Sequence, residues 1–162
     1  MLDTSISIEK EIKTHDDRWF MCRILPYRTE DNNVDGITLL FDEITQLKES
    51  QERFRAIFEQ TLESTVLVDV KSGTIVEFNR KACEYLDYSI EEFTNQSIYE
   101  LIADRQKEKY DQHIKKVIER GLDIFEIYLK NKISQHFKTQ ISSRLVMIKS
   151  KQYAQSIWWR FR

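Results

Sequence analysis

Few side chains in this sequence could do covalent or metal chemistry, and the cysteines are the first to consider. Cys22 and Cys83 are the two cysteines of the 162 residues, and they lie far apart in unrelated contexts. Two cysteines cannot by themselves form a disulfide framework or a cysteine-type zinc site. We therefore expect both to be small, buried, reduced residues.

The three histidines do not form a metal-binding pattern either. His15 and His136 fall in turn or strand contexts, and neither has a glutamate or a second histidine at ligand spacing. His113 is a lone histidine on a charged helical segment, where histidine is more often a surface or capping residue than a ligand. The sequence therefore predicts no metal site.

Enzyme motifs are also missing from the sequence. Three glycines in the whole chain rule out a glycine-rich phosphate loop, and we find no nucleophile elbow. The histidine box of histidine kinases and the loop of diguanylate cyclases are absent. The acidic pair Glu91-Glu92 lies where a helix begins, so the helix dipole explains it. We expect this chain to be non-catalytic, with any catalysis carried by other parts of a larger protein.

Composition limits the partners that the chain could bind. Lysine and arginine number 25 against 27 for aspartate and glutamate, so no net charge attracts nucleic acid or an anionic membrane. No segment approaches 18 consecutive apolar residues, and the first residues lack the apolar core of a signal peptide. We expect a cytoplasmic protein without nucleic acid or direct membrane contact. Its length fits one domain, or one domain plus a fragment.

The elements that would position these residues begin with strands. Residues 6–45 alternate apolar and polar residues in three runs separated by the turn signals HDD and TEDNNVDG, which predicts an antiparallel meander. Residues 45–61 then form a charged helix. Its apolar spacing of 3, 4, 3 and 4 over Ile44, Leu47, Gln51, Phe54 and Phe58 is typical of a coiled-coil seam.

That helix has two interpretations. It covers the core of its own domain, or it is a linker that pairs with the same helix of a second copy. About two heptads are short for an autonomous coiled coil, so pairing would need support from flanking surfaces.

Residues 62–162 predict a complete α+β domain. Residues 64–79 read as two strands around a turn, and Asn79 is placed to cap the helix RKACEYL. Ser89 begins a capping box, and an amphipathic helix stops at Gly121. Three strands follow, in DIFEIYLKN, HFKTQISSRLVMIKS and YAQSIWWRFR. These strands match the first three in layout, so the chain reads as a repeat unit preceded by the last part of an earlier copy.

The stretch LVDVKSGTIVEFNRKACEYLDYSIEEF resembles the opening of a PAS domain, with Asp87 where a glycine is usual. The resemblance covers residues 62–162 and implies an antiparallel five-stranded sheet with helices on one face. Residues 1–45 resemble the last three strands of another PAS copy. RWFMCRILPYRTEDNNVDGITLLFDEIT is similar to PAS segments of chemotaxis methyltransferase and methylesterase fusion proteins and of multi-sensor histidine kinases.

The resemblance also implies a signal-transmission joint. PAS domains join the last strand to the exit helix through Asp-x-Thr, which stands here as Glu43-Ile44-Thr45. Glu43 and Thr45 are therefore candidates for this joint. The second copy departs from the family pattern, because no such motif and no exit helix follow its last strand in this sequence.

Some PAS domains hold a cofactor between sheet and helices. The Asn-Cys-Arg-Phe-Leu motif of flavin photoreceptors is absent, and the position of the haem-binding histidine is Tyr110 here, with His113 one turn on. We predict no cofactor, with haem or a small apolar ligand as alternatives. The residues that would line a pocket are apolar and come from strands and helices alike: Val66, Val68, Phe78, Leu86, Phe93, Ile102, Tyr110, Ile114, Val117, Phe125, Ile127 and Ile141. The other interpretation is that they close on each other as core.

Two features predict a homodimer. One is the helix seam with Leu47, Phe54 and Phe58; the other is the pair Trp158-Trp159, because adjacent strand residues face opposite sides and one indole should lie outside the core. A neighbouring helix could cover that indole instead. The function that follows is a sensory or signal-relaying PAS module of a larger protein. A scaffold that only dimerises and sets spacing is the alternative, and a ligand sensor is the second.

Overall fold

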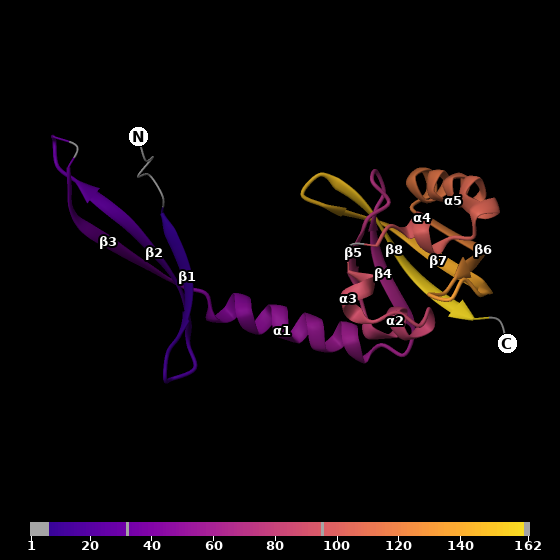
Figure 1. Ribbon diagram of the computed structural model, residues 1–162, viewed down its shortest axis with the longest axis horizontal. Helices are drawn as coiled ribbons and strands as arrows, with labels where there is room; N and C mark the ends of the chain where they lie inside the picture. The colour runs from indigo at the N-terminus through magenta and orange to yellow at the C-terminus, as the bar shows by residue number, and fades with distance from the viewer. Residues whose placement is uncertain (1–6, 32, 95, 161–162) are drawn as a thin grey trace. The chain divides into compact units, whose positions relative to one another are not determined.

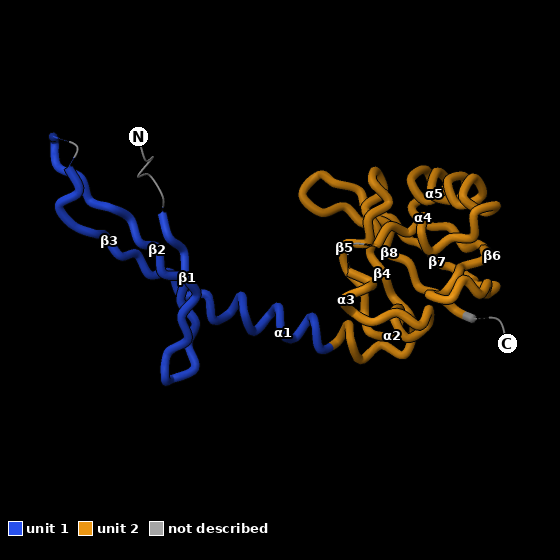
Figure 2. The backbone as a smooth tube through the Cα atoms, viewed as in Figure 1, with its two compact units in different colours: residues 1–56 blue, residues 57–162 orange. Residues whose placement is uncertain are grey.

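The computed structural model describes residues 7–31, 33–94 and 96–160 and divides into two compact units (Figure 2), residues 1–56 and 57–162. Helix α1, Thr45–Gln60, crosses the boundary between them. Our division of the chain into residues 1–45, 45–61 and 62–162 stays a prediction. None of the helices within the described ranges is long and apolar enough to cross a membrane.

The first unit is a three-stranded antiparallel sheet in the order β1-β2-β3, with β1 at Ile8–Lys13, β2 at Trp19–Arg28 and β3 at Val34–Glu43. Cross-strand partners lie on the same face of a sheet. The register therefore places one set of apolar side chains on the same face, together with Lys10 and Glu43: Ile8, Ile12, Phe20, Cys22, Ile24, Pro26, Ile37, Leu39 and Phe41. We call these residues the apolar face of the β1–β3 sheet.

The opposite face of that sheet mixes charged side chains with apolar ones such as Met21, Leu25 and Leu40. The Arg23 guanidinium lies 2.8 Å from a carboxylate oxygen of Glu9 and 3.2 Å from one of Asp42, one on each neighbouring strand. Lys48, in the first turn of α1, pairs with Glu11 at 2.6 Å. These ion pairs thus lie on the mixed face, whereas the other face is mainly apolar.

The second unit contains the predicted five-stranded antiparallel sheet (Figure 1). Its order is β5-β4-β8-β7-β6. The strands are β4 Ser64–Asp69, β5 Ile75–Phe78, β6 Leu122–Lys130, β7 His136–Ile148 and β8 Lys151–Arg160. Strand β4, near the start of the unit, pairs with the central strand β8 at its end. This sheet and the separate three-stranded sheet confirm the predicted α+β fold class.

The helices of the second unit lie between β5 and β6 in sequence and begin at local caps. They are α2 Arg80–Tyr85, α3 Ile90–Phe93, α4 Ile98–Leu101, the 3-10 turn η1 Asp104–Gln106 and α5 Lys107–Arg120. Asn79 caps α2, and capping boxes at Ser89 and Ser97 start α3 and α4. Gly121 ends α5 in the left-handed region at φ 81°.

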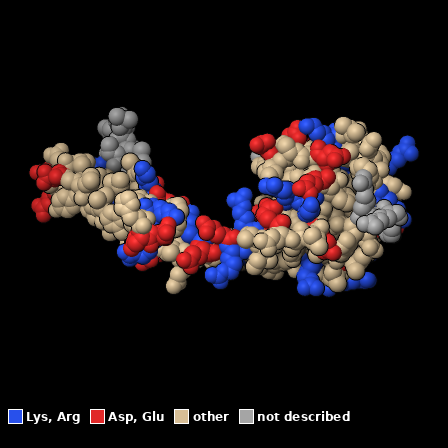
Figure 3. Space-filling view, turned by 90° about the horizontal axis from the view of Figure 1, so that it is seen from below, with Lys and Arg blue, Asp and Glu red and all other residues tan. Residues whose placement is uncertain are grey.

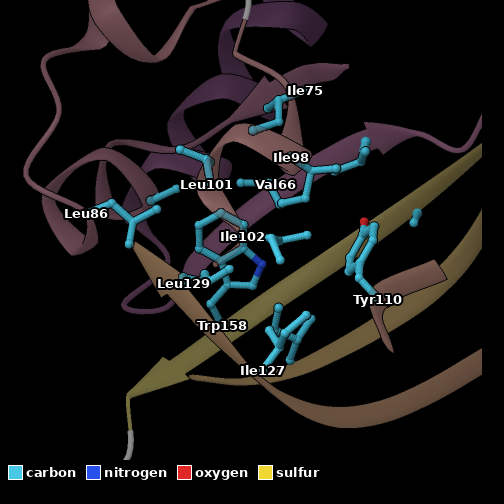
Figure 4. Close-up of a cluster of buried hydrophobic side chains, with 14 of the residues drawn as sticks. Val66, Ile75, Leu86, Ile98, Leu101, Ile102, Tyr110, Ile127, Leu129 and Trp158 are labelled. Atoms are coloured by element: carbon cyan, nitrogen blue, oxygen red, sulfur yellow. The ribbon is translucent and has the colours of Figure 1, made fainter. Parts of the chain in front are cut away.

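These helices and one face of the sheet enclose the core (Figure 4). Alternate residues of each strand point inward; on β8 they are Ala154, Ser156 and Trp158, all buried. Helix residues such as Leu101 and Ile114 close the other side. The core of the second unit is therefore a single cluster between sheet and helices.

Candidate functional site

The residues predicted to line a pocket come together in this core. All of them except Val117 and Phe78 belong to the one buried cluster; Val117 is buried elsewhere, and Phe78 is half-buried and packs against the cluster. Sequence reasoning missed other large members of the cluster, among them Leu101 and Leu129, although their apolar type and alternation could have indicated them.

The side chains around Tyr110 close on each other. A cavity of about 10 Å³ lies between Val68, Tyr99, Tyr110 and Ile114, and a single water needs roughly that volume. The Tyr110 ring packs edge-to-face on Tyr99 and Phe125, with ring centroids 5.7 Å and 6.1 Å apart. This cavity cannot admit a porphyrin, so the residues at the haem position of the family do not fit haem here.

His113 is engaged outside this cavity. Its ring stacks on Phe125 with centroids 4.2 Å apart, and its Nδ1 lies 2.6 Å from Oδ2 of Asp123. These contacts hold α5 against the start of β6. Within residues 7–31, 33–94 and 96–160, no three histidine, cysteine, aspartate or glutamate side chains are grouped so that they could hold a metal ion.

Trp158 is the largest fully enclosed side chain of the cluster, and its indole lies among Leu101, Ile102 and Leu129 (Figure 4). Its Nε1–H has no hydrogen-bond partner; Gln106 Oε1 is the other such buried atom in the part of the chain that the structure describes. A buried donor without a partner costs about 1–3 kcal/mol. The core thus contains one polar group that an acceptor would stabilise.

Trp159 lies on the opposite side of β8 and is half-buried. Its Nε1–H donates to Oε1 of Glu63 at 2.9 Å. The outer face of the sheet therefore carries this second indole next to the segment that follows α1.

The structure brings Glu43 and Thr45 together where β3 passes into α1. The Thr45 hydroxyl accepts the backbone N–H of Trp19 at 3.0 Å and donates to Oε1 of Glu43 at 3.0 Å. The backbone N–H of Ile44 donates to the Trp19 carbonyl oxygen at 2.8 Å. These bonds link the first turn of α1 to strand β2. The role of Glu43 and Thr45 in signal transmission stays a prediction.

Helix α1 buries none of its residues, all of which the structure describes. Leu47 is 56% exposed and Phe54 61%, whereas Phe58 is half-buried. Ile57, which is 63% exposed, belongs to the same apolar surface and was missed because it falls beside the seam rather than on it. We call Leu47, Phe54 and Ile57 the exposed α1 surface.

Asn79 does more than cap α2. It is fully buried, and its Oδ1 accepts the backbone N–H groups of Thr65 at 3.0 Å and Ala82 at 3.1 Å. Its Nδ2 donates to the Thr61 hydroxyl at 2.7 Å and to the Glu63 carbonyl oxygen at 2.8 Å. One side chain thus joins the segment after α1, strand β4 and helix α2. The sequence indicated the cap, because a cap is local, but not the long-range partners.

Comparison with known proteins agrees with this geometry. A model of the PAS fold matches residues 52–144, which is more than half of the chain, and a PAS-domain model matches residues 2–45. No curated protein matches the chain.

Solved structures share the fold. The PAS domain of an HTR-like protein from Haloarcula marismortui has a TM-score of 0.63 at 20% identity, over 72% of this chain and 95% of that one. A PAS domain from a two-component sensor histidine kinase has a TM-score of 0.64 at 9% identity, over 72% and 100%. That of nitrogen regulation protein NR(II) from Vibrio parahaemolyticus has 0.54 at 12%, over 66% and 96%. By its sheet order and these family matches, the chain belongs to the PAS domain family.

Proposed function

We propose that this chain is a non-catalytic, cytoplasmic signalling module that relays a signal through helix α1 within a homodimer. The observation that carries the proposal is the exposed α1 surface on a helix that joins one PAS-type sheet to another. PAS domains are sensory modules of multidomain proteins. We infer a larger parent protein with an output domain, of the chemotaxis-fusion or histidine-kinase type.

The physical case for pairing is that α1 has no buried residue to stabilise it. Acidic and basic side chains are interspersed along it (Figure 3), so its surface is solvated except where Leu47, Phe54 and Ile57 project. A helix of 16 residues is marginal by itself in water. A second copy of the same helix would bury these apolar side chains and stabilise both.

Sedimentation equilibrium on substituted α1 tests the relay dimer. Leu47→Gln and Phe54→Gln should each raise the dissociation constant about tenfold, which is about 1.4 kcal/mol. Glu52→Gln is the matched control, since Glu52 is five residues from both Leu47 and Ile57 and so lies on the opposite side of the same helix. A monomeric wild-type protein at about 100 μM, or equal constants for Phe54→Gln and Glu52→Gln, would contradict the proposal.

A ligand sensor is the second candidate, and the unpartnered Nε1–H of Trp158 is the observation that favours it. A small apolar molecule with one hydrogen-bond acceptor would satisfy this donor if the core opened around it. Native mass spectrometry of the protein as purified distinguishes the candidates. A mass excess lost on denaturation supports the sensor, whereas a bare dimer supports a relay or a scaffold that only sets spacing.

A further inference from the structure

We propose that Glu59 is a positioning residue that fixes the last turn of α1 on the first residue of α2. The proposal rests on the relay function above and names the contact through which the end of α1 would be held. All the groups involved lie in the second unit.

The contact joins two helices through one side chain. Oε2 of Glu59 accepts the backbone N–H of Arg80 at 2.9 Å, across 21 residues of sequence. Arg80 is the first residue of α2, and the N–H groups of a first turn have no partner within their own helix. Glu59 therefore satisfies from α1 a donor that Asn79, which caps at Ala82, leaves open.

The neighbouring residue of α1 is linked to the cap of α2 through Thr61. The Thr61 hydroxyl donates to the carbonyl oxygen of Phe58 at 2.8 Å and accepts one hydrogen of Asn79 Nδ2 at 2.7 Å. The Glu59 carboxylate directly, and the Phe58 carbonyl through Thr61, thus both meet the start of α2. Two such links fix the rotation of the last turn about its axis, which one link would not.

These contacts are polar, and the apolar side chain beside them is only partly buried. Phe58 is half-buried, and α1 buries no residue completely. Hydrogen bonds are directional and depend steeply on angle, whereas apolar contact tolerates sliding. The bond of Glu59 to Arg80 is exposed, so this part of the joint can open without opening the core.

The Glu59 carboxylate also lies near the thiol of Cys83. Cys83 is buried in α2, and burial, followed by the negative charge of Glu59, raises the pKa of its thiol to about 11. The carboxylate is exposed to solvent on one side and bonded to the start of α2 on the other.

Residue-resolved hydrogen exchange of the full chain by NMR tests the proposal. Glu59→Ala should speed exchange of the Arg80 amide at least tenfold, together with the amides of residues 58–60 at the end of α1. The Thr65 amide, which donates to Asn79, should stay within twofold. Glu59→Gln keeps an acceptor oxygen and should restore slow exchange. Glu49→Ala, another exposed carboxylate of α1, is the matched control and should change none of these rates.

Three results would overturn the proposal. The first is that the Arg80 amide exchanges in Glu59→Ala at the wild-type rate. The second is that exchange of the Arg80 amide accelerates but that of residues 58–60 does not, so that Glu59 only caps α2. The third is that Glu59→Gln shows the same exchange rates as Glu59→Ala. These rates report the joint and not the association of two chains. If the wild-type protein is a monomer in sedimentation, the relay dimer is excluded but the Glu59 contact is not. If Glu59→Ala leaves the exchange rates unchanged, the Glu59 contact is excluded but the relay dimer is not.

Discussion

At the scale of single residues, Tyr99 combines burial with a charged neighbour. Its hydroxyl donates to Oδ1 of Asp111 at 2.6 Å. Burial first, and then the hydrogen bond and the negative charge of Asp111, raise the pKa of Tyr99 from 10.0 to about 12. Each cause disfavours the tyrosinate form in the folded protein. Burial also raises the pKa of Tyr110 nearby.

This shift predicts a loss of stability in alkali. The unfolded chain releases the Tyr99 proton near pH 10 and the folded one near pH 12, so its contribution is complete below pH 10 and lost between the two values. Urea unfolding between pH 9 and 12 should show this fall, and Tyr99→Phe should make it shallower, with Tyr110 supplying the remainder. Asp111→Asn should lower the tyrosinate pKa only in part, since burial persists. A fall of equal depth in Tyr99→Phe and the wild type would contradict the assignment.

Asp87 occupies a backbone position that favours glycine. Its φ is 60°, a conformation that glycine adopts without steric cost, and its Oδ2 accepts the Nδ2–H of buried Asn131 at 2.9 Å. Asp87→Ala keeps the strained backbone and removes the acceptor, so we expect a loss of about 2 kcal/mol. Asp87→Gly removes the acceptor but relieves the backbone, so about 1 kcal/mol should remain. Chemical denaturation of both variants measures the difference, and the opposite order would refute this explanation.

At the scale of elements, substitutions at two glycines can distinguish the cost of backbone strain from the cost of a side-chain clash. Gly73 has φ 73° and Gly121 φ 81°, but only at Gly73 would an added Cβ meet a neighbour, 2.5 Å from Cε2 of Tyr99. Gly121→Ala should cost about 1 kcal/mol, from its backbone alone. Gly73→Ala should cost about 1–3 kcal/mol more, because the Tyr99 ring, held by Asp111, must move. Equal losses in thermal unfolding would show that the ring yields freely.

The elements were predictable where their causes are local. The caps at Asn79 and Ser89 and the stop at Gly121 depend on residues within one turn, and the structure has all three. The contact of Glu59 with Arg80 joins groups 21 residues apart, and no local pattern encodes it. Alternation predicted that one of the two adjacent indoles faces the core. The pairing of Trp158 with Ser64 on β4 places it on the buried side, and that pairing is a property of the folded sheet.

At the scale of the whole molecule, the apolar face of the β1–β3 sheet has the largest consequence. Phe41 is 57% exposed and Ile37 66%. An open sheet with one apolar face gains stability when a second surface covers it. We expect a second copy to contribute this cover, so that deletion of residues 1–43 weakens self-association.

Two adjacent substitutions test this without a deletion. Phe41 pairs with Cys22 and lies on the apolar face, whereas Leu40 pairs with Arg23 on the opposite, mixed face. Phe41→Ser should weaken self-association about tenfold by analytical ultracentrifugation, and Leu40→Ser should change it by less than twofold. Equal effects of the two substitutions would exclude the apolar face as the interface.

The two cysteines, first noted for the chemistry they cannot do, divide evenly between the units. Cys22 is buried in the first and Cys83 in the second, and neither is bonded to another sulfur. A buried thiol reacts with a labelling reagent only when its surroundings open. Each unit thus contains one buried thiol whose labelling rate can be measured. The labelling rate of each thiol, read separately by peptide mass, reports how often that unit opens, without any added probe.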